Sequence, residues 1–206
     1  GTPIHLVRNE RYWGLAPAFD RLVFQEISSD KARLATFRNG QSDLFSASPE
    51  QYRELIKDPS LMSHVQKFEY ENMLGGYRFV AWNELNPLFA DKRVRQAMTL
   101  LLDRQRMIQE IQYGYAVLAT GPFNPQSKQY NPAVTPWGYD VAAAQKLLAE
   151  AGFKPGADNV LYSPNGKRFE FKLTYPAGAS NYDQMALFMK DAYAKAGMIL
   201  KPDPLE

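Results

Sequence analysis

The side chains that could do chemistry are few and lie far apart in the chain. Neither of the two histidines, His5 and His64, belongs to an HExxH motif, a histidine cluster or a cysteine pair. Residues 165–168 read Asn-Gly-Lys-Arg, which has the Gly-Lys pair of a phosphate loop. The earlier glycine is absent, however, and Arg168 stands where Ser or Thr would hold magnesium. With no G-x-S-x-G motif either, the sequence predicts no catalytic centre.

A pair of arginines is the remaining candidate for anion binding. Arg93 and Arg95 stand two residues apart in a segment with helical periodicity. Side chains at that spacing point to different sides of a helix, so the two would not hold one carboxylate together. We expect each arginine to be solvated or ion-paired.

The composition excludes several classes of function. A net charge of +2, with basic and acidic residues interspersed, predicts neither a nucleic-acid-binding surface nor a polybasic membrane patch. The chain has no cysteine, which rules out disulfides, thiolate metal sites and a cysteine nucleophile. No apolar run approaches the roughly 20 residues that cross a bilayer. Aromatic residues make up 13%, which suits a binding cleft, although most should fill core positions.

The strongest pattern of local structure is in residues 86–104. Asp91 is placed to cap a helix whose apolar residues recur at helical spacing, and Asp103 with Arg104 opens a second amphipathic segment. The expected core residues of the first helix are Val94, Ala97, Met98, Leu101 and Leu102. The opposite face carries polar residues, including Lys92, Gln96 and Thr99. The pattern therefore predicts a helix pair with one buried face.

Strands and helices alternate around this pair, which predicts an α/β protein with a parallel or mixed sheet. Before it we expect strands at 4–8, 22–27 and 43–46, helices at 30–37 and 49–57, and extended segments at 65–71 and 77–83. Gly75 and Gly76 lie between the last two. After the pair we expect a proline-bearing loop at 119–138, a helix from Asp140, a hairpin around residues 165–166 and a helix from about residue 181.

Five blocks in fixed order resemble a known family. They read RNERYWG (8–14), DKARLATFRNGQSDL (30–44), NPLFADKRVRQAMTLLLDR (86–104), YGYAVLATGPFNP (113–125) and YDVAAAQKLLAEAGF (139–153). Their order and wording are similar to those of the peptide-type bacterial extracellular solute-binding proteins, the receptors of oligopeptide, dipeptide and nickel ABC importers. The third block resembles the segment that links the two lobes in that family. Where the family has two consecutive prolines in this segment, this chain has Pro87 followed by Leu88.

The resemblance implies a fold and a division of the chain. The fold would be α/β, part of a two-lobe periplasmic-binding-protein type II fold with mixed sheets flanked by helices. Residues 1–76 would be part of lobe I and residues 77–206 the first half of lobe II, with the paired glycines at the crossing. Because receptors of this family are longer than this chain, we expect it to be an internal portion of one.

The resemblance also implies a function. The protein would capture peptides, or a related small solute, and deliver them to the membrane subunits of an ABC permease. It would act in the periplasm, or outside the cell attached to the membrane, as a monomer without catalysis, cofactor, metal or nucleic acid. The ligand would lie between lobes that close over it. The residues expected to touch it, at the crossing and in the loop after the helix pair, are Tyr77, Phe79, Trp82, Asn83, Gly121 and Phe123.

Alternatives stay open at this point. Other members of the family bind nickel chelates or sugars, so the five blocks do not decide the ligand class. The same module could be the ligand-sensing part of a transcriptional regulator. A hydrolase is the third alternative, although the sequence supplies almost none of the groups that it would need.

Overall fold

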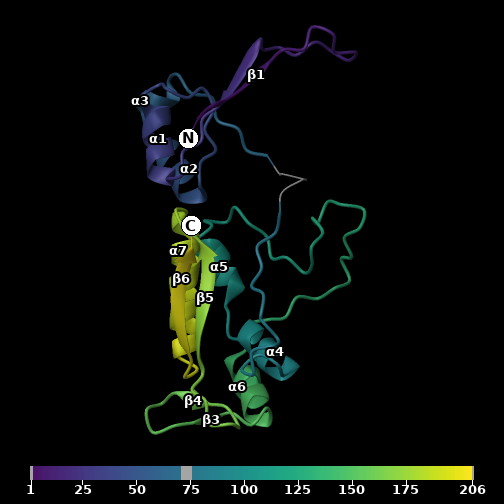
Figure 1. Cartoon of the computed structure of the whole chain (residues 1–206), viewed down its shortest axis with the longest axis vertical. Helices are drawn as coiled ribbons and strands as arrows, with labels where there is room; N and C mark the ends of the chain where they lie inside the picture. Colours follow the sequence, from purple (N-terminus) through teal and green to yellow (C-terminus); the bar gives the residue numbers. More distant parts are fainter. Residues whose placement is uncertain (1, 71–75, 206) are drawn as a thin grey trace. The chain divides into compact units, whose positions relative to one another are not determined.

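The computed structural model describes residues 2–70 and 76–205 (Figure 1). Contacts between backbone segments divide the chain into two compact units, Gly1–Ser46 and Ala47–Glu206. The predicted crossing between lobes falls on Gly75, which lies outside the described residues, and on Gly76 beside it. The lobe boundary after residue 76 therefore stays a prediction.

The first unit holds one small sheet and one helix. Strand β1 (Ile4–Val7) pairs antiparallel with β2 (Arg21–Phe24). Helix α1 (Asp30–Arg38) begins at Ser29, whose side chain accepts a hydrogen bond from the Ala32 amide. Both strands and the capped helix confirm the prediction.

The strand expected at residues 43–46 is wrong, because that stretch has no regular secondary structure. Its backbone makes a local bond instead, since the Ser42 hydroxyl donates to the Leu44 carbonyl at 2.8 Å. Short polar side chains favour such local bonds over a sheet ladder. The sheet of this unit is consequently antiparallel rather than parallel or mixed.

The second unit opens with two short helices. Helix α2 (Pro49–Leu55) carries a capping box, in which Ser48 and Gln51 each accept a hydrogen bond from the other's backbone amide. Helix α3 (Pro59–Met62), which we did not predict, begins at Asp58. The described parts of the two expected extended segments, residues 65–70 and 77–83, form no strand.

The helix pair forms as predicted. Helix α4 (Lys92–Leu100) begins at Asp91, and helix α5 (Arg104–Glu110) begins at Asp103. All five expected core residues of the first helix are buried. The loop at 119–138 has no helix or strand, as expected.

The remaining elements build a helix-covered parallel sheet. Helix α6 (Val141–Glu150) packs on α4. The short strands β3 (Lys154–Pro155) and β4 (Leu161–Tyr162) pair antiparallel. Strand β5 (Glu170–Pro176) then pairs parallel with β6 (Ile199–Leu205), and α7 (Ser180–Ala194) connects them and runs alongside both (Figure 1).

The predicted hairpin forms only in part. Gly166 has the positive φ of a tight turn, 73°, and the Ser163 amide donates to the Lys167 carbonyl across it. Beyond the turn, a single bridge joins Tyr162 to Arg168. Strand β5 pairs with the distant β6 instead, because that pairing buries Phe171 against the core.

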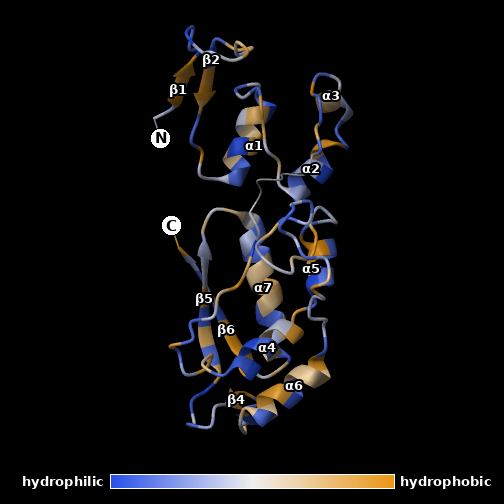
Figure 2. Ribbon diagram, turned by 90° about the vertical axis from the view of Figure 1, so that its right-hand side faces the viewer, coloured by the Kyte–Doolittle hydropathy of each residue, from blue (hydrophilic) through white to orange (hydrophobic). Residues whose placement is uncertain are grey.

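One continuous core lies in the second unit. It joins α4, α5, α6, α7, β5 and β6, and its largest fully buried side chains are Tyr193, Phe169 and Met98. In the first unit, by contrast, three of the four residues in each of β1 and β2 are hydrophobic (Figure 2), and every residue of both strands is exposed. The described chain is thus an α/β protein whose packed interior belongs to residues 47–205.

Candidate ligand-binding site

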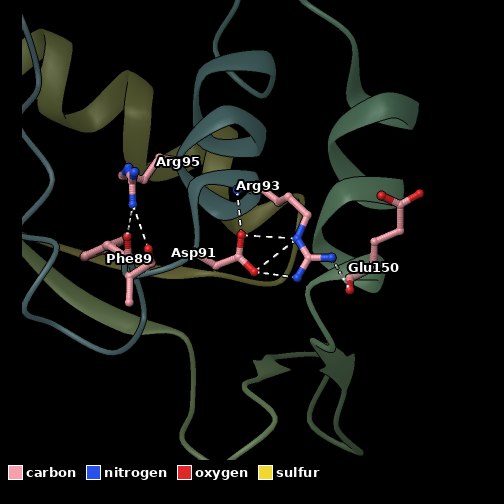
Figure 3. A network of polar contacts seen from close by, with 6 residues as sticks. Phe89, Asp91, Arg93, Arg95 and Glu150 are labelled. Atoms are coloured by element: carbon pink, nitrogen blue, oxygen red, sulfur yellow. Dashed lines mark hydrogen bonds and ion pairs between the residues drawn. The ribbon is translucent and has the colours of Figure 1, made fainter.

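A polar network fixes the start of α4 (Figure 3). Asp91 accepts from the Arg93 amide at 2.8 Å and pairs with the Arg93 guanidinium at 2.6 Å. These hydrogen bonds from Arg93 hold the pKa of the Asp91 carboxyl below its usual value. Arg93 also donates to the Glu150 carbonyl at 2.8 Å, so it ties α4 to the end of α6.

Arg95 has different partners from Arg93. Its Nη1 donates to the carbonyls of Phe89 and Ala90 at 2.7 and 2.9 Å, as Figure 3 shows for Phe89, and its Nη2 lies 3.1 Å from Glu84 Oε1. The prediction that each arginine is solvated or ion-paired is confirmed, since Arg93 pairs with Asp91 and Arg95 with Glu84. Neither guanidinium shares a carboxylate with the other.

Trp82 belongs to the core as well as to the expected site. Its ring centroid lies 4.9 Å from that of Phe89, 5.9 Å from Phe171 and 6.4 Å from Tyr193. Tilted and edge-on pairs of this kind are the favoured aromatic geometries. The indole is therefore held in one position from one side, while part of it remains exposed.

A hollow of about 500 Å³ lies beside the polar face of α4. Its size is that of a small-molecule site, and polar side chains line it together with two indoles. The lining residues are Val80, Trp82, Glu84, Lys92, Arg95, Gln96, Thr99 and Trp137. A solute with several hydrogen-bonding groups fits such a lining better than a purely apolar one.

Sequence reasoning missed most of this lining. Lys92, Gln96 and Thr99 were expected only as polar residues on the helix face opposite the core, and Trp137 lies in the loop at 119–138. The one local signal for the hollow was the row of polar residues on the helix that follows Trp82 in the sequence. Nothing in the order of residues brings Trp137 to that stripe.

The other expected residues lie apart from the hollow. The rings of Tyr77 and Phe79 pack on each other at 5.4 Å and remain 47% and 70% exposed. Asn83 Oδ1 accepts from the Leu85 amide at 3.0 Å, which closes a local turn. Of the four residues expected from 77–83, Trp82 alone lines the hollow.

The loop residues Gly121 and Phe123 are not among the hollow's lining residues. Phe123 is half exposed, and a Cβ at Gly121 would meet no atom within 4 Å. The hollow thus does not unite the two groups of residues expected from the sequence. Their shared contact with a ligand stays a prediction.

Reactive groups are sparse in the part of the chain that the structure describes. Its residues contain no group of three or more His, Asp or Glu side chains that could hold a metal ion. His5 lies in β1 and His64 follows α3. No helix within the described ranges is long and apolar enough to cross a membrane.

Comparison with known proteins assigns the chain to a family. The model of the bacterial extracellular solute-binding proteins, family 5 middle, matches residues 1–206, and the chain belongs to this family. The oligopeptide-binding protein AppA of Bacillus subtilis is 28% identical over 100% of the chain and 37% of its own length. The heme-binding protein A of Haemophilus influenzae is 28% identical over 97% of the chain and 34% of its own length. The chain thus spans little more than a third of these relatives.

Solved structures agree in fold. The structure of B. subtilis AppA in complex with a nonapeptide superimposes with a TM-score of 0.84 at 28% identity, over 100% of this chain and 40% of that one. NikA of Brucella suis, in complex with Fe(III)-EDTA, gives a TM-score of 0.80 at 24% identity, over 98% of this chain and 40% of the NikA chain. The predicted family and α/β fold are confirmed.

Proposed function

We propose that this chain is part of the solute-binding component of an ABC importer, which captures peptides reversibly and hands them to a membrane permease. The observation that carries the proposal is the match to AppA, an oligopeptide-binding protein whose nonapeptide complex aligns with the whole chain. The hollow beside α4 agrees with it, because peptide groups offer many donors and acceptors to polar walls. The protein would act without catalysis, as a monomer in the periplasm or at the cell exterior.

The residues that we propose to touch the solute are those expected from the sequence. Tyr77 and Phe79 offer exposed rings, and Trp82 offers a rigid one at the hollow. Asn83, Gly121 and Phe123 complete the set. Aromatic walls accept many side chains while backbone groups hold the peptide, which would give broad specificity.

Mass spectrometry of the solute that co-purifies with the natural gene product tests the proposal. We expect a mixture of short peptides, released on denaturation. A nickel chelate, a heme or a sugar in their place would refute the peptide assignment. Peptides incubated with the protein should also stay intact, and cleavage products would revive a hydrolase.

A matched pair of variants tests the site. Phe79→Ala removes a ring that is 70% exposed, and Phe68→Ala removes one that is 67% exposed outside the proposed set. We expect the first to weaken peptide binding several-fold in calorimetry and the second to leave it unchanged. Equal effects would contradict the placement of the site.

A further inference from the structure

The loop at 119–138 contains local hydrogen bonds that shape it. The amides of Ser127, Tyr130 and Val134 each donate to a carbonyl three residues earlier, at 2.8, 3.1 and 3.3 Å. Bonds of this kind close turns, and they attach the loop to no helix. Trp137, near the end of the loop, nevertheless lines the hollow beside α4 with a side chain that is 49% exposed. Contacts from outside the loop must therefore hold this residue at the helix.

Two hydrogen bonds attach the end of the loop to the corner between α4 and α5. The Arg104 guanidinium donates through Nη2 to the Trp137 carbonyl. Three residues after Trp137, the Asp140 amide donates to the Leu100 carbonyl at 3.0 Å. Leu100 ends α4 and Arg104 begins α5, and the two leucines that follow Leu100 are buried in the core. The loop is thus attached to a part of the chain that the core itself fixes.

Arg104 differs in its partners from the other arginines of residues 86–104. Arg93 and Arg95 also donate to backbone carbonyls, but each of them pairs with a carboxylate as well. Arg104 has no acidic partner within residues 2–70 and 76–205. It is half-buried, and burial lowers the pKa of its guanidinium because the charged form loses water. Its bond to the Trp137 carbonyl is charge-assisted, and such bonds are about twice as strong as neutral ones.

The two indoles of the hollow are held by different means. Trp82 packs among three rings of the core. Trp137 has no ring contact of this kind in the described parts of the chain. The hydrogen bond at its carbonyl instead fixes the backbone from which the indole extends. Loss of that bond should therefore displace Trp137 and leave Trp82 in place.

We propose that Arg104 positions Trp137 as a wall of the hollow against which an apolar side chain of the captured peptide packs. The proposal rests on the proposed function, because it names one contact within the same binding protein. A half-exposed indole presents a broad apolar face beside the polar groups of α4. Arg104 does not line the hollow and acts through Trp137. It holds the indole before the solute arrives, which lowers the entropy lost on binding.

Calorimetry with the natural gene product that carries this chain tests the proposal, with Ala-Phe-Ala and trialanine as probes. The two peptides differ by one phenyl group. We expect Ala-Phe-Ala to bind about three- to tenfold more tightly, the effect of one aromatic pair. Trp137→Ala and Arg104→Gln should each reduce this preference to less than about twofold, since either change removes the positioned indole.

A double variant separates positioning from a general loss of structure. If Arg104 acts through Trp137, Arg104→Gln should weaken Ala-Phe-Ala binding no further in a protein that already carries Trp137→Ala. Arg104→Lys keeps the charge and a donor, so it should retain part of the preference, and it serves as the test if Arg104→Gln does not fold. Arg168→Gln is the matched control and should leave the preference unchanged, because that arginine pairs with Asp158 and does not line the hollow.

Equal binding of the two peptides by the wild type, or additive losses in the double variant, overturns the proposal. If neither peptide binds, the peptide function itself fails. The indole N–H resonance of Trp137 in the NMR spectrum, identified by its loss in Trp137→Phe, then decides the role of Arg104. A shift of this resonance in Arg104→Gln and Arg104→Lys, with none in Arg168→Gln, supports positioning, whereas an unchanged resonance refutes it.

Discussion

Removing one buried hydroxyl should test how the core is held together. Tyr193 is fully buried, and its hydroxyl donates to the Met98 carbonyl at 3.2 Å. Met98 lies in the last turn of α4, where carbonyls lack helical partners. The Leu102 amide, which would continue the helix to Met98, bonds to the Thr99 carbonyl instead. Tyr193 is thus the donor that satisfies the Met98 carbonyl among the described residues.

Tyr193→Phe keeps the ring and leaves that carbonyl buried without a donor. The expected cost is about 1 to 3 kcal/mol of unfolding free energy. For a chain of this size it corresponds to a Tm lower by roughly 2 to 10 °C. Ring contacts with Trp82 and Phe171 should persist, so little of the loss would come from packing.

Urea unfolding followed by circular dichroism measures the loss. Tyr175→Phe is the control, because the Tyr175 hydroxyl donates to Asp183 at 2.9 Å from a side chain that is only partly buried. We expect the control to cost less than about 0.5 kcal/mol. A Tyr193→Phe protein as stable as the wild type, or no less stable than the control, would refute the role of the hydroxyl.

The same residue predicts a dependence on alkaline pH. Burial raises the pKa of the Tyr193 phenol, so the folded state keeps it neutral. The stability that the neutral Tyr193 phenol contributes is fully present below the unfolded-state pKa of about 10. It is lost as the pH rises above that value, because the unfolded chain releases the proton first. Wild-type stability should therefore fall more steeply above pH 10 than that of Tyr193→Phe.

Four further substitutions have defined outcomes in the same unfolding assay. Gly152→Ala should lower the unfolding free energy more than Gly40→Ala. Both glycines have a positive φ, 86° and 69°, but a methyl at 152 would meet Pro164 Cγ at 2.8 Å, whereas a methyl at 40 would meet no atom within 4 Å. Equal losses of stability would contradict this reasoning. Ser48→Ala should lose about 1 kcal/mol with its capping box, and no loss would show that α2 does not need the cap. Asp91→Asn should remove the stabilisation that the lowered carboxyl pKa provides above about pH 4, so that stability falls less than in the wild type as the pH drops below that value.

Local features of the chain were predictable because their causes are local. Ser48, Asp91 and Asp140 each stand directly before a helix and accept hydrogen bonds from its first amides. The buried face of α4 follows from helical spacing alone. These elements needed no knowledge of what they pack against.

Features that join distant segments were not predictable in the same way. Strand β5 follows a turn that favours a hairpin, but its register is set by pairing with β6 across α7. Trp82 looked like a ligand contact, and three rings supplied from residues 89, 171 and 193 make it part of the core as well. The hollow similarly depends on Trp137, which a loop brings back to α4.

The unequal surroundings of the three tryptophans provide an optical probe. Trp13 is 91% exposed and Trp137 is 49% exposed, whereas Trp82 stacks among aromatic neighbours. Acrylamide should quench Trp13 first and leave a blue-shifted emission dominated by Trp82. Because Trp82 and Trp137 both border the hollow, a solute that enters it changes the fluorescence of two indoles without any added dye.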